Sequence, residues 1–83
     1  MLQPRIVEVC AGEDLTLLLR YETGEVKRFD VSPYAEGDWF GMLNDPAYFR
    51  SVHLIPGGSG IEWAEGQDIA PHELYENSVA ITE

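Results

Sequence analysis

Cysteine is nearly absent from this chain, since Cys10 is the only one among 83 residues. An intramolecular disulfide is therefore excluded, and a lone thiol is typical of proteins that fold in a reducing cytosol. Long apolar runs are also missing, and none approaches the roughly 20 residues that span a bilayer. The first residues lack the basic and apolar segments of a signal peptide. We expect a cytoplasmic protein with no membrane association.

Basic residues are scarce as well. Lysine and arginine together number five against fifteen acidic residues, which gives a formal net charge of -10. After Arg50 the chain has no lysine or arginine at all, and its acids there are Glu62, Glu65, Asp68, Glu73, Glu76 and Glu83. This half would repel nucleic-acid phosphates and attract a basic protein. The alternative is that the charge only keeps the protein soluble.

Signatures of catalysis are missing too. The sequence has no nucleophile triad, no set of metal ligands and no cofactor loop. The glycine-rich segment 56–60 lacks the lysine of a phosphate-binding loop, and we expect a flexible hairpin loop there. His72 could join Asp68 and Glu76 in a weak metal site, but we expect a surface histidine, a solvated His53 and a Cys10 that acts as a small apolar strand residue. We predict no enzyme, no cofactor and no metal.

The hydrophobic pattern is that of one small α+β domain over residues 1–83. Period-two alternation from Leu15 to Tyr21 predicts a strand between strands at 6–11 and 26–31. Gly24 allows a tight hairpin turn. Lys27 shares the apolar face of its strand with Phe29 and Val31, so either it lies beyond the core edge or a bulge resets the register.

The second half predicts shorter elements. Residues 37–43 have helical spacing, and Asp45 with Pro46 is a typical helix start. We expect strands at 52–55 and 61–63, a helical turn at 71–75 capped by Asp68, and fraying from residue 77. The fold class is thus α+β, with about five antiparallel strands and short helical segments between strands 3 and 4 and at the C-terminus. Asp30 is expected to form a turn.

Three segments together resemble the bacterial domain-of-unknown-function family 2442. They are Tyr-Glu-Thr-Gly-Glu-Val-Lys-Arg-Phe-Asp-Val-Ser-Pro-Tyr at 21–34, a sparse pattern at 37–52, and Ile-Glu-Trp followed by Gly66, Asp68-Ile69, Pro71 and Leu74-Tyr75. The resemblance covers about residues 4–78 and implies a small α+β fold without known catalytic residues. It also implies a short protein encoded beside another small protein, as in toxin–antitoxin pairs. Some relatives append a helix-turn-helix.

These observations lead to two hypotheses. The first is a small acidic protein-interaction module, the antitoxin-like partner of a small basic protein, with candidate partner-binding residues Trp39, Trp63, Glu62, Glu65, Asp68, Glu73 and Tyr75. The second is a regulatory nucleic-acid-associated domain that acts through the hairpin of Arg20, Lys27 and Arg28. The same three cations could instead contact the acidic half of a second copy in a homo-oligomer.

Overall fold

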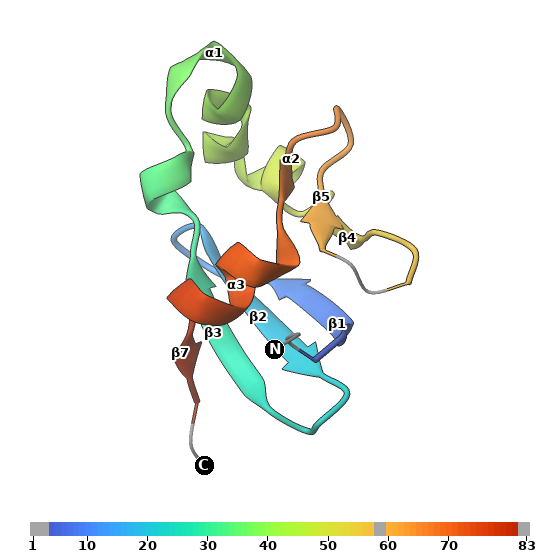
Figure 1. The fold of residues 1–83 in the computed structure, drawn as a ribbon. Helices are drawn as coiled ribbons and strands as arrows, with labels where there is room; N and C mark the ends of the chain where they lie inside the picture. Colours follow the sequence, from blue (N-terminus) through green and yellow to red (C-terminus); the bar gives the residue numbers. More distant parts are fainter. Residues whose placement is uncertain (1–3, 58–59, 82–83) are drawn as a thin grey trace.

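A four-stranded antiparallel sheet forms the base of the structure, a computed structural model that describes residues 4–57 and 60–81 (Figure 1). Its strands are β1 (Ile6–Ala11), β2 (Thr16–Tyr21), β3 (Val26–Asp30) and β7 (Val79–Ala80), in the order β1-β2-β3-β7. The first three strands follow one another as a meander. The α+β class and the first three predicted strands are confirmed.

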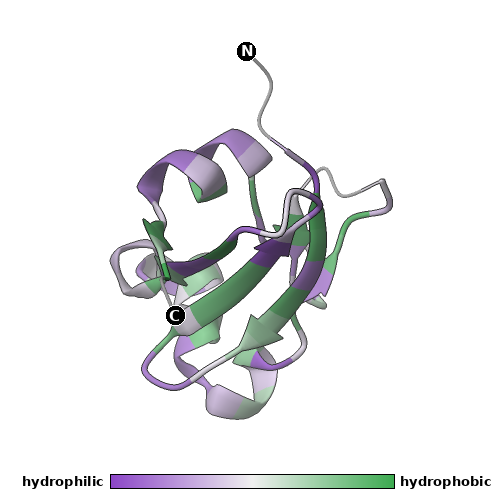
Figure 2. Ribbon diagram, turned by 90° about the horizontal axis from the view of Figure 1, so that it is seen from below, coloured by the Kyte–Doolittle hydropathy of each residue, from purple (hydrophilic) through white to green (hydrophobic). Residues whose placement is uncertain are grey.

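Alternation in β2 determines which face of this sheet is buried. Leu17, Leu19 and Tyr21 are almost completely buried, while Leu18 and Arg20 point to solvent. In Figure 2 the strands of the large sheet are mostly green and interrupted by purple segments, as this alternation requires. Gly24 has φ +95° in the turn that leads into β3, a conformation that glycine adopts without strain. The predicted hairpin is confirmed.

Short helical segments connect the large sheet to a smaller one. They are η1 (Ser32–Tyr34), α1 (Gly37–Phe40), η2 (Gly41–Asn44) and α2 (Pro46–Phe49). The helix predicted over 37–43 is thus an α-helical turn followed by a 3-10 turn. The predicted start at Asp45 is confirmed, because its carboxylate accepts the Ala47 N–H at 3.0 Å. Asp30 also forms the expected turn, accepting both the N–H and the hydroxyl of Ser32.

The smaller sheet is antiparallel and consists of β4 (His53–Leu54), β5 (Ile61–Glu62) and β6 (Asp68–Ile69), followed by α3 (Pro71–Asn77). The sequence did not reveal β6, and the capping role expected for Asp68 is wrong. Asp68 pairs with Glu62 in the sheet. The N-cap of α3 is Ala70, which makes no side-chain capping bond.

Residues 79–81 are part of the large sheet, contrary to the fraying expected from residue 77. β7 pairs antiparallel with β3, and the Ile81 N–H donates to the Val26 carbonyl at 2.9 Å. Residues 58–59 of the glycine-rich loop and residues 82–83 lie outside the described residues. Within the described residues no helix is long and apolar enough to cross a membrane.

The core lies between the inner face of the large sheet, α3 and the smaller sheet (Figure 1). Lys27 lies at the edge of this inner face without a bulge, since β2 and β3 pair in continuous register. Its Nζ donates to the Tyr75 carbonyl at 2.6 Å and lies 3.8 Å from the centre of the Tyr75 ring. The only irregularity in β1–β2 pairing is between Ile6 and Glu8. Of the two alternatives for Lys27, the edge position is therefore confirmed.

Candidate functional site

Three polar side chains form a row across the solvent face of the smaller sheet. His53 on β4 pairs with Glu62 on β5, and Glu62 pairs with Asp68 on β6. Their neighbours Ile61 and Ile69 are buried on the opposite face. Strand alternation therefore directs two carboxylates outward side by side. Glu65 adds a third, exposed on the turn between β5 and β6.

Exposed apolar side chains lie beside this turn. Trp39 of α1 is 49% exposed, and Met42 of η2 is 37% exposed. A Cβ placed on Gly66 would lie 4.0 Å from the Trp39 ring, so the indole lies next to the turn that carries Glu65. We call this region the acidic-turn surface, defined by Trp39, Met42, Glu62, Glu65 and Asp68.

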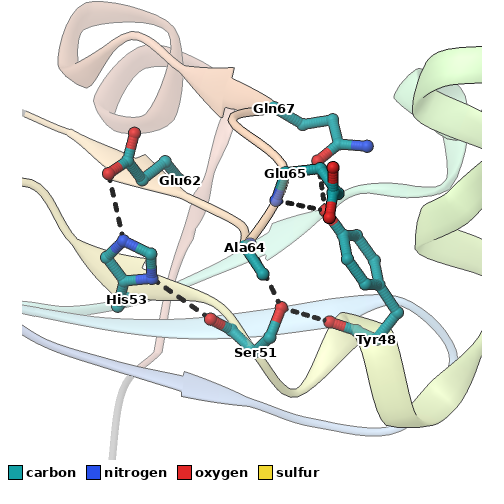
Figure 3. A network of polar contacts seen from close by, with 7 residues as sticks. All are labelled: Tyr48, Ser51, His53, Glu62, Ala64, Glu65 and Gln67. Atoms are coloured by element: carbon teal, nitrogen blue, oxygen red, sulfur yellow. Dashed lines mark hydrogen bonds and ion pairs between the residues drawn. The ribbon is translucent and has the colours of Figure 1, made fainter.

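Gln67 links the two parts of this surface, the turn that carries Glu65 and the helix α1 that carries Trp39. It is the one buried polar residue among those described, 1% exposed. Its Nε2 donates to the Trp39 carbonyl at 2.8 Å, and its Oε1 accepts from the Tyr48 hydroxyl at 2.5 Å. The Tyr48 oxygen in turn accepts the Glu65 N–H at 2.7 Å (Figure 3). The turn and α1 are thus connected through one amide.

His53 connects the other end of the row to α2. Its Nδ1 lies 3.2 Å from the Ser51 carbonyl and its Nε2 lies 3.0 Å from Glu62 (Figure 3). The Ser51 carbonyl first, and then the hydrogen bond to Glu62, raise the pKa of His53 above its ordinary value. The Ser51 hydroxyl donates to the Tyr48 carbonyl at 2.6 Å and accepts the Ala64 N–H at 3.4 Å. The row and the turn therefore share one polar network.

The acidic-turn surface has the chemistry to bind a cationic side chain. Glu62 has His53 as an ion-pair partner, whereas Glu65 and Asp68 have none among residues 4–57 and 60–81. Unpaired carboxylates accept hydrogen bonds from lysine or arginine. An exposed indole binds cations over its face and is a frequent anchor at protein interfaces.

Other predicted partner-binding residues lie elsewhere. Trp63 is 1% exposed and its indole N–H donates to the Phe49 carbonyl at 2.9 Å, so the expectation that it offers surface to a partner is wrong. Its alternation with buried Ile61 places it in the core. Glu73 accepts a hydrogen bond from the Tyr34 hydroxyl, which raises the pKa of Tyr34. Tyr75 donates to Glu25 at 3.0 Å.

The basic hairpin does not form one patch. Arg20 makes an ion pair with Glu8 on the outer face of the large sheet. Arg28 shares that face, but Lys27 lies on the inner face against Tyr75. The expectation that the three cations act together is therefore wrong, because neighbouring strand residues point to opposite faces.

The remaining reactive side chains, Cys10 and His72, each contact one carboxylate, that of Glu8 and of Glu76 respectively. Cys10 is a free thiol on β1 and is exposed rather than packed as an apolar side chain. His72 pairs with Glu76 at 3.3 Å, while Asp68 lies on β6 instead of one helical turn away. In the part of the chain that the structure describes, no three histidine, cysteine or acidic side chains are grouped to hold a metal.

Sequence reasoning missed Tyr48, Met42 and Gln67 as parts of the site. Gln67 and Ile69 are two residues apart in a segment that ends before Pro71, so in a strand they would share one face. This spacing could have indicated a short strand with an inward amide. No signal in the sequence indicated that Gln67 reaches Trp39, since 28 residues separate them.

A family described as "Protein of unknown function (DUF2442)" matches residues 6–80 of the chain. Comparison with curated proteins and with solved structures gives no match.

Proposed function

We propose that this chain, which belongs to the DUF2442 family, is a non-enzymatic protein-interaction module of the bacterial cytosol that binds a small basic protein. In this proposal the chain is the antitoxin-like member of such a pair. The observation that carries it is Trp39, 49% exposed and fixed through its carbonyl beside the turn that carries Glu65. Glu65 and the nearby Asp68 of β6 have no ion-pair partner among the described residues.

Charge would act first in binding. A net charge of -10 creates a long-range field that accelerates encounter with a cationic protein and weakens as salt increases. Glu62, Glu65 and Asp68 would then receive lysine or arginine side chains of the partner. The fixed backbone of the turn lowers the entropy that has to be lost on docking.

Trp39 would supply the apolar centre of the contact. An indole of this exposure, next to Met42, can bury its face against a partner and bind a guanidinium over its ring. Because tryptophan and arginine dominate the energy of many interfaces, we expect Trp39 to contribute more than any single carboxylate.

Nucleic-acid binding through Arg20, Lys27 and Arg28 has less support. Lys27 contacts Tyr75 on the inner face and Arg20 pairs with Glu8. Of the three cations, Arg28 alone has no such contact within the part of the chain that the structure describes. A single cation gives a weak phosphate footprint against a net charge of -10.

The experiment is affinity purification of the tagged chain from its native cytosol, with elution at increasing salt. A site variant carries Glu62→Gln, Glu65→Gln and Asp68→Asn. A control variant carries the same change of charge on the β1–β2 and β2–β3 turns through Glu13→Gln, Asp14→Asn and Glu22→Gln.

The proposal predicts a small basic protein that co-purifies in stoichiometric amount and is released by salt. The site variant and Trp39→Ala should retain at least about tenfold less of it, while the control variant retains wild-type amounts. Equal loss from both triple variants would show that only total charge matters and would contradict a localised surface. A chain that emerges without a partner would remove the antitoxin-like assignment.

A further inference from the structure

The last strand of the large sheet offers an open edge. β7 pairs with β3 on one side, and no strand among the described residues pairs with its other side (Figure 1). Val79 is 62% exposed and Ile81 is 37% exposed, and the segment 78–81 contains no charged residue. Natural proteins rarely leave an apolar edge strand without a charge, a proline or a bulge.

The direction of the backbone bonds shows which groups this edge presents. Ile81 donates its N–H to the Val26 carbonyl, so it faces β3. Lys27 pairs with Ala80 in the register of these strands. Because hydrogen-bonded and non-hydrogen-bonded positions alternate in an antiparallel ladder, the N–H and carbonyl of Ala80 point away from β3 to the open edge.

The opposite edge of the same sheet is protected. β1 carries Glu8, which pairs with Arg20, and its pairing is irregular between Ile6 and Glu8. β4 also lies against β1. A charge, an irregularity and a covering segment are among the usual means of blocking edge pairing, and within the described residues the two-residue strand β7 has none of these three. The two edges therefore differ in their capacity to accept another strand.

We propose that β7 pairs antiparallel with β7 of a second copy, which extends the four-stranded sheet across a twofold axis near Ala80. In this arrangement Val79 of one copy lies opposite Ile81 of the other. Val26 and Arg28 flank this pair on the outer face, because Arg28 is the neighbour of Val79 in the register. The edge is self-complementary in polarity and hydrogen bonding, as a twofold contact requires.

Electrostatics favours this edge over other surfaces for contact between identical chains. Two molecules of charge -10 repel each other, and β3, the strand next to β7, carries Lys27 and Arg28. The two Arg28 residues would lie three strand spacings apart and two residues out of line along the strands, about 16 Å in all. This exceeds the screening length of about 8 Å at physiological salt, so their mutual repulsion is small. Added salt should strengthen the dimer because it screens the remaining acids.

The experiment is sedimentation velocity of the full chain over a micromolar-to-millimolar concentration series at low and high salt. The wild type should move from the monomer mass toward twice that mass, at lower concentration in high salt. Val79→Lys should weaken association by about tenfold or more. Val7→Lys is the matched control, because Val7 is 53% exposed on the protected edge strand β1, and it should leave association unchanged.

Hydrogen exchange identifies the contact itself. The Ala80 amide should gain protection as concentration rises, while the Ile81 amide, bonded to Val26, should be protected throughout. A monomer at all concentrations would overturn the proposal. So would a dimer that Val79→Lys and Val7→Lys weaken equally, or one that leaves Ala80 exchange independent of concentration.

Discussion

Replacing Gln67 with leucine tests whether one buried amide fixes the acidic-turn surface. The change keeps a side chain of similar size in the core but removes the bonds to the Trp39 carbonyl and the Tyr48 hydroxyl. Tyr48 still accepts the Glu65 N–H but loses the acceptor for its own proton. The expected result is a destabilised fold and a turn that opens locally.

The magnitude follows from the two polar groups left without partners. Each costs about 1–3 kcal/mol when buried, and both are only partly buried here, so we expect a loss of about 2–3 kcal/mol. A domain of this length has a total stability of about 4–12 kcal/mol. Since 1 kcal/mol shifts the Tm of a small domain by about 4–8 °C, the Tm of Gln67→Leu should fall by about 10–20 °C.

The assay is thermal and urea unfolding followed by circular dichroism, with hydrogen exchange at the Glu65 amide as the local readout. Asp68→Leu is the matched control, because it places leucine at the next position of the chain on the exposed face. It should change stability by no more than about 0.5 kcal/mol. A Gln67→Leu protein as stable as this control, with the Glu65 amide still protected, would refute the role assigned to Gln67.

Three further predictions concern single positions. Gly66→Ala should lower the free energy of unfolding in urea by about 1–2 kcal/mol, because the φ of Gly66 is +104°. The control Gly41→Ala, at φ -61° with open space for a Cβ, should be neutral or stabilising, and equal effects of the two changes would contradict this. The raised pKa of His53 means that its contacts stabilise the fold fully below its ordinary pKa of 6.5 and lose that effect as pH rises through the folded-state pKa. An NMR titration should give a midpoint above 6.5 that falls in Glu62→Gln, and an unchanged midpoint would disprove the contact. Tyr21→Phe should leave the free energy of unfolding equal or up to about 1–2 kcal/mol higher, because the buried Tyr21 hydroxyl has no hydrogen-bond partner among the described residues. Burial first, and then Tyr75 and Glu25, raise the pKa of Tyr21 to about 12. A clear loss of stability in Tyr21→Phe would show that the hydroxyl has a partner.

The large sheet could be predicted because its signals are local. Alternating residues from Leu17 to Tyr21 give both the strand and its buried face, and Gly24 gives the turn. The start of α2 at Asp45 was likewise visible in two adjacent residues. Each of these elements is specified by side chains within one or two turns of the chain.

The candidate site could be predicted only in part, because it depends on contacts between distant segments. Trp39 and Glu65 were identified from their residue types, but their proximity results from Gln67, whose strand β6 is two residues long. So short a strand gives only a weak periodic signal, the shared face of Gln67 and Ile69 on either side of Asp68, and nothing that indicates the distant partner Trp39. The surroundings of Lys27 could not be predicted for the same reason, because Tyr75, whose backbone carbonyl accepts a hydrogen bond from Lys27 Nζ, lies 48 residues away.

The most direct test of the proposed function is the emission of Trp39 during titration with the basic protein that co-purifies. Trp39 is 49% exposed and Trp63 is 1% exposed, so binding at the acidic-turn surface should change the emission of Trp39 alone. We predict a saturable blue shift that is absent in Trp39→Phe and weakened by high salt. Binding at full affinity with no change in emission would place the partner elsewhere and contradict the account.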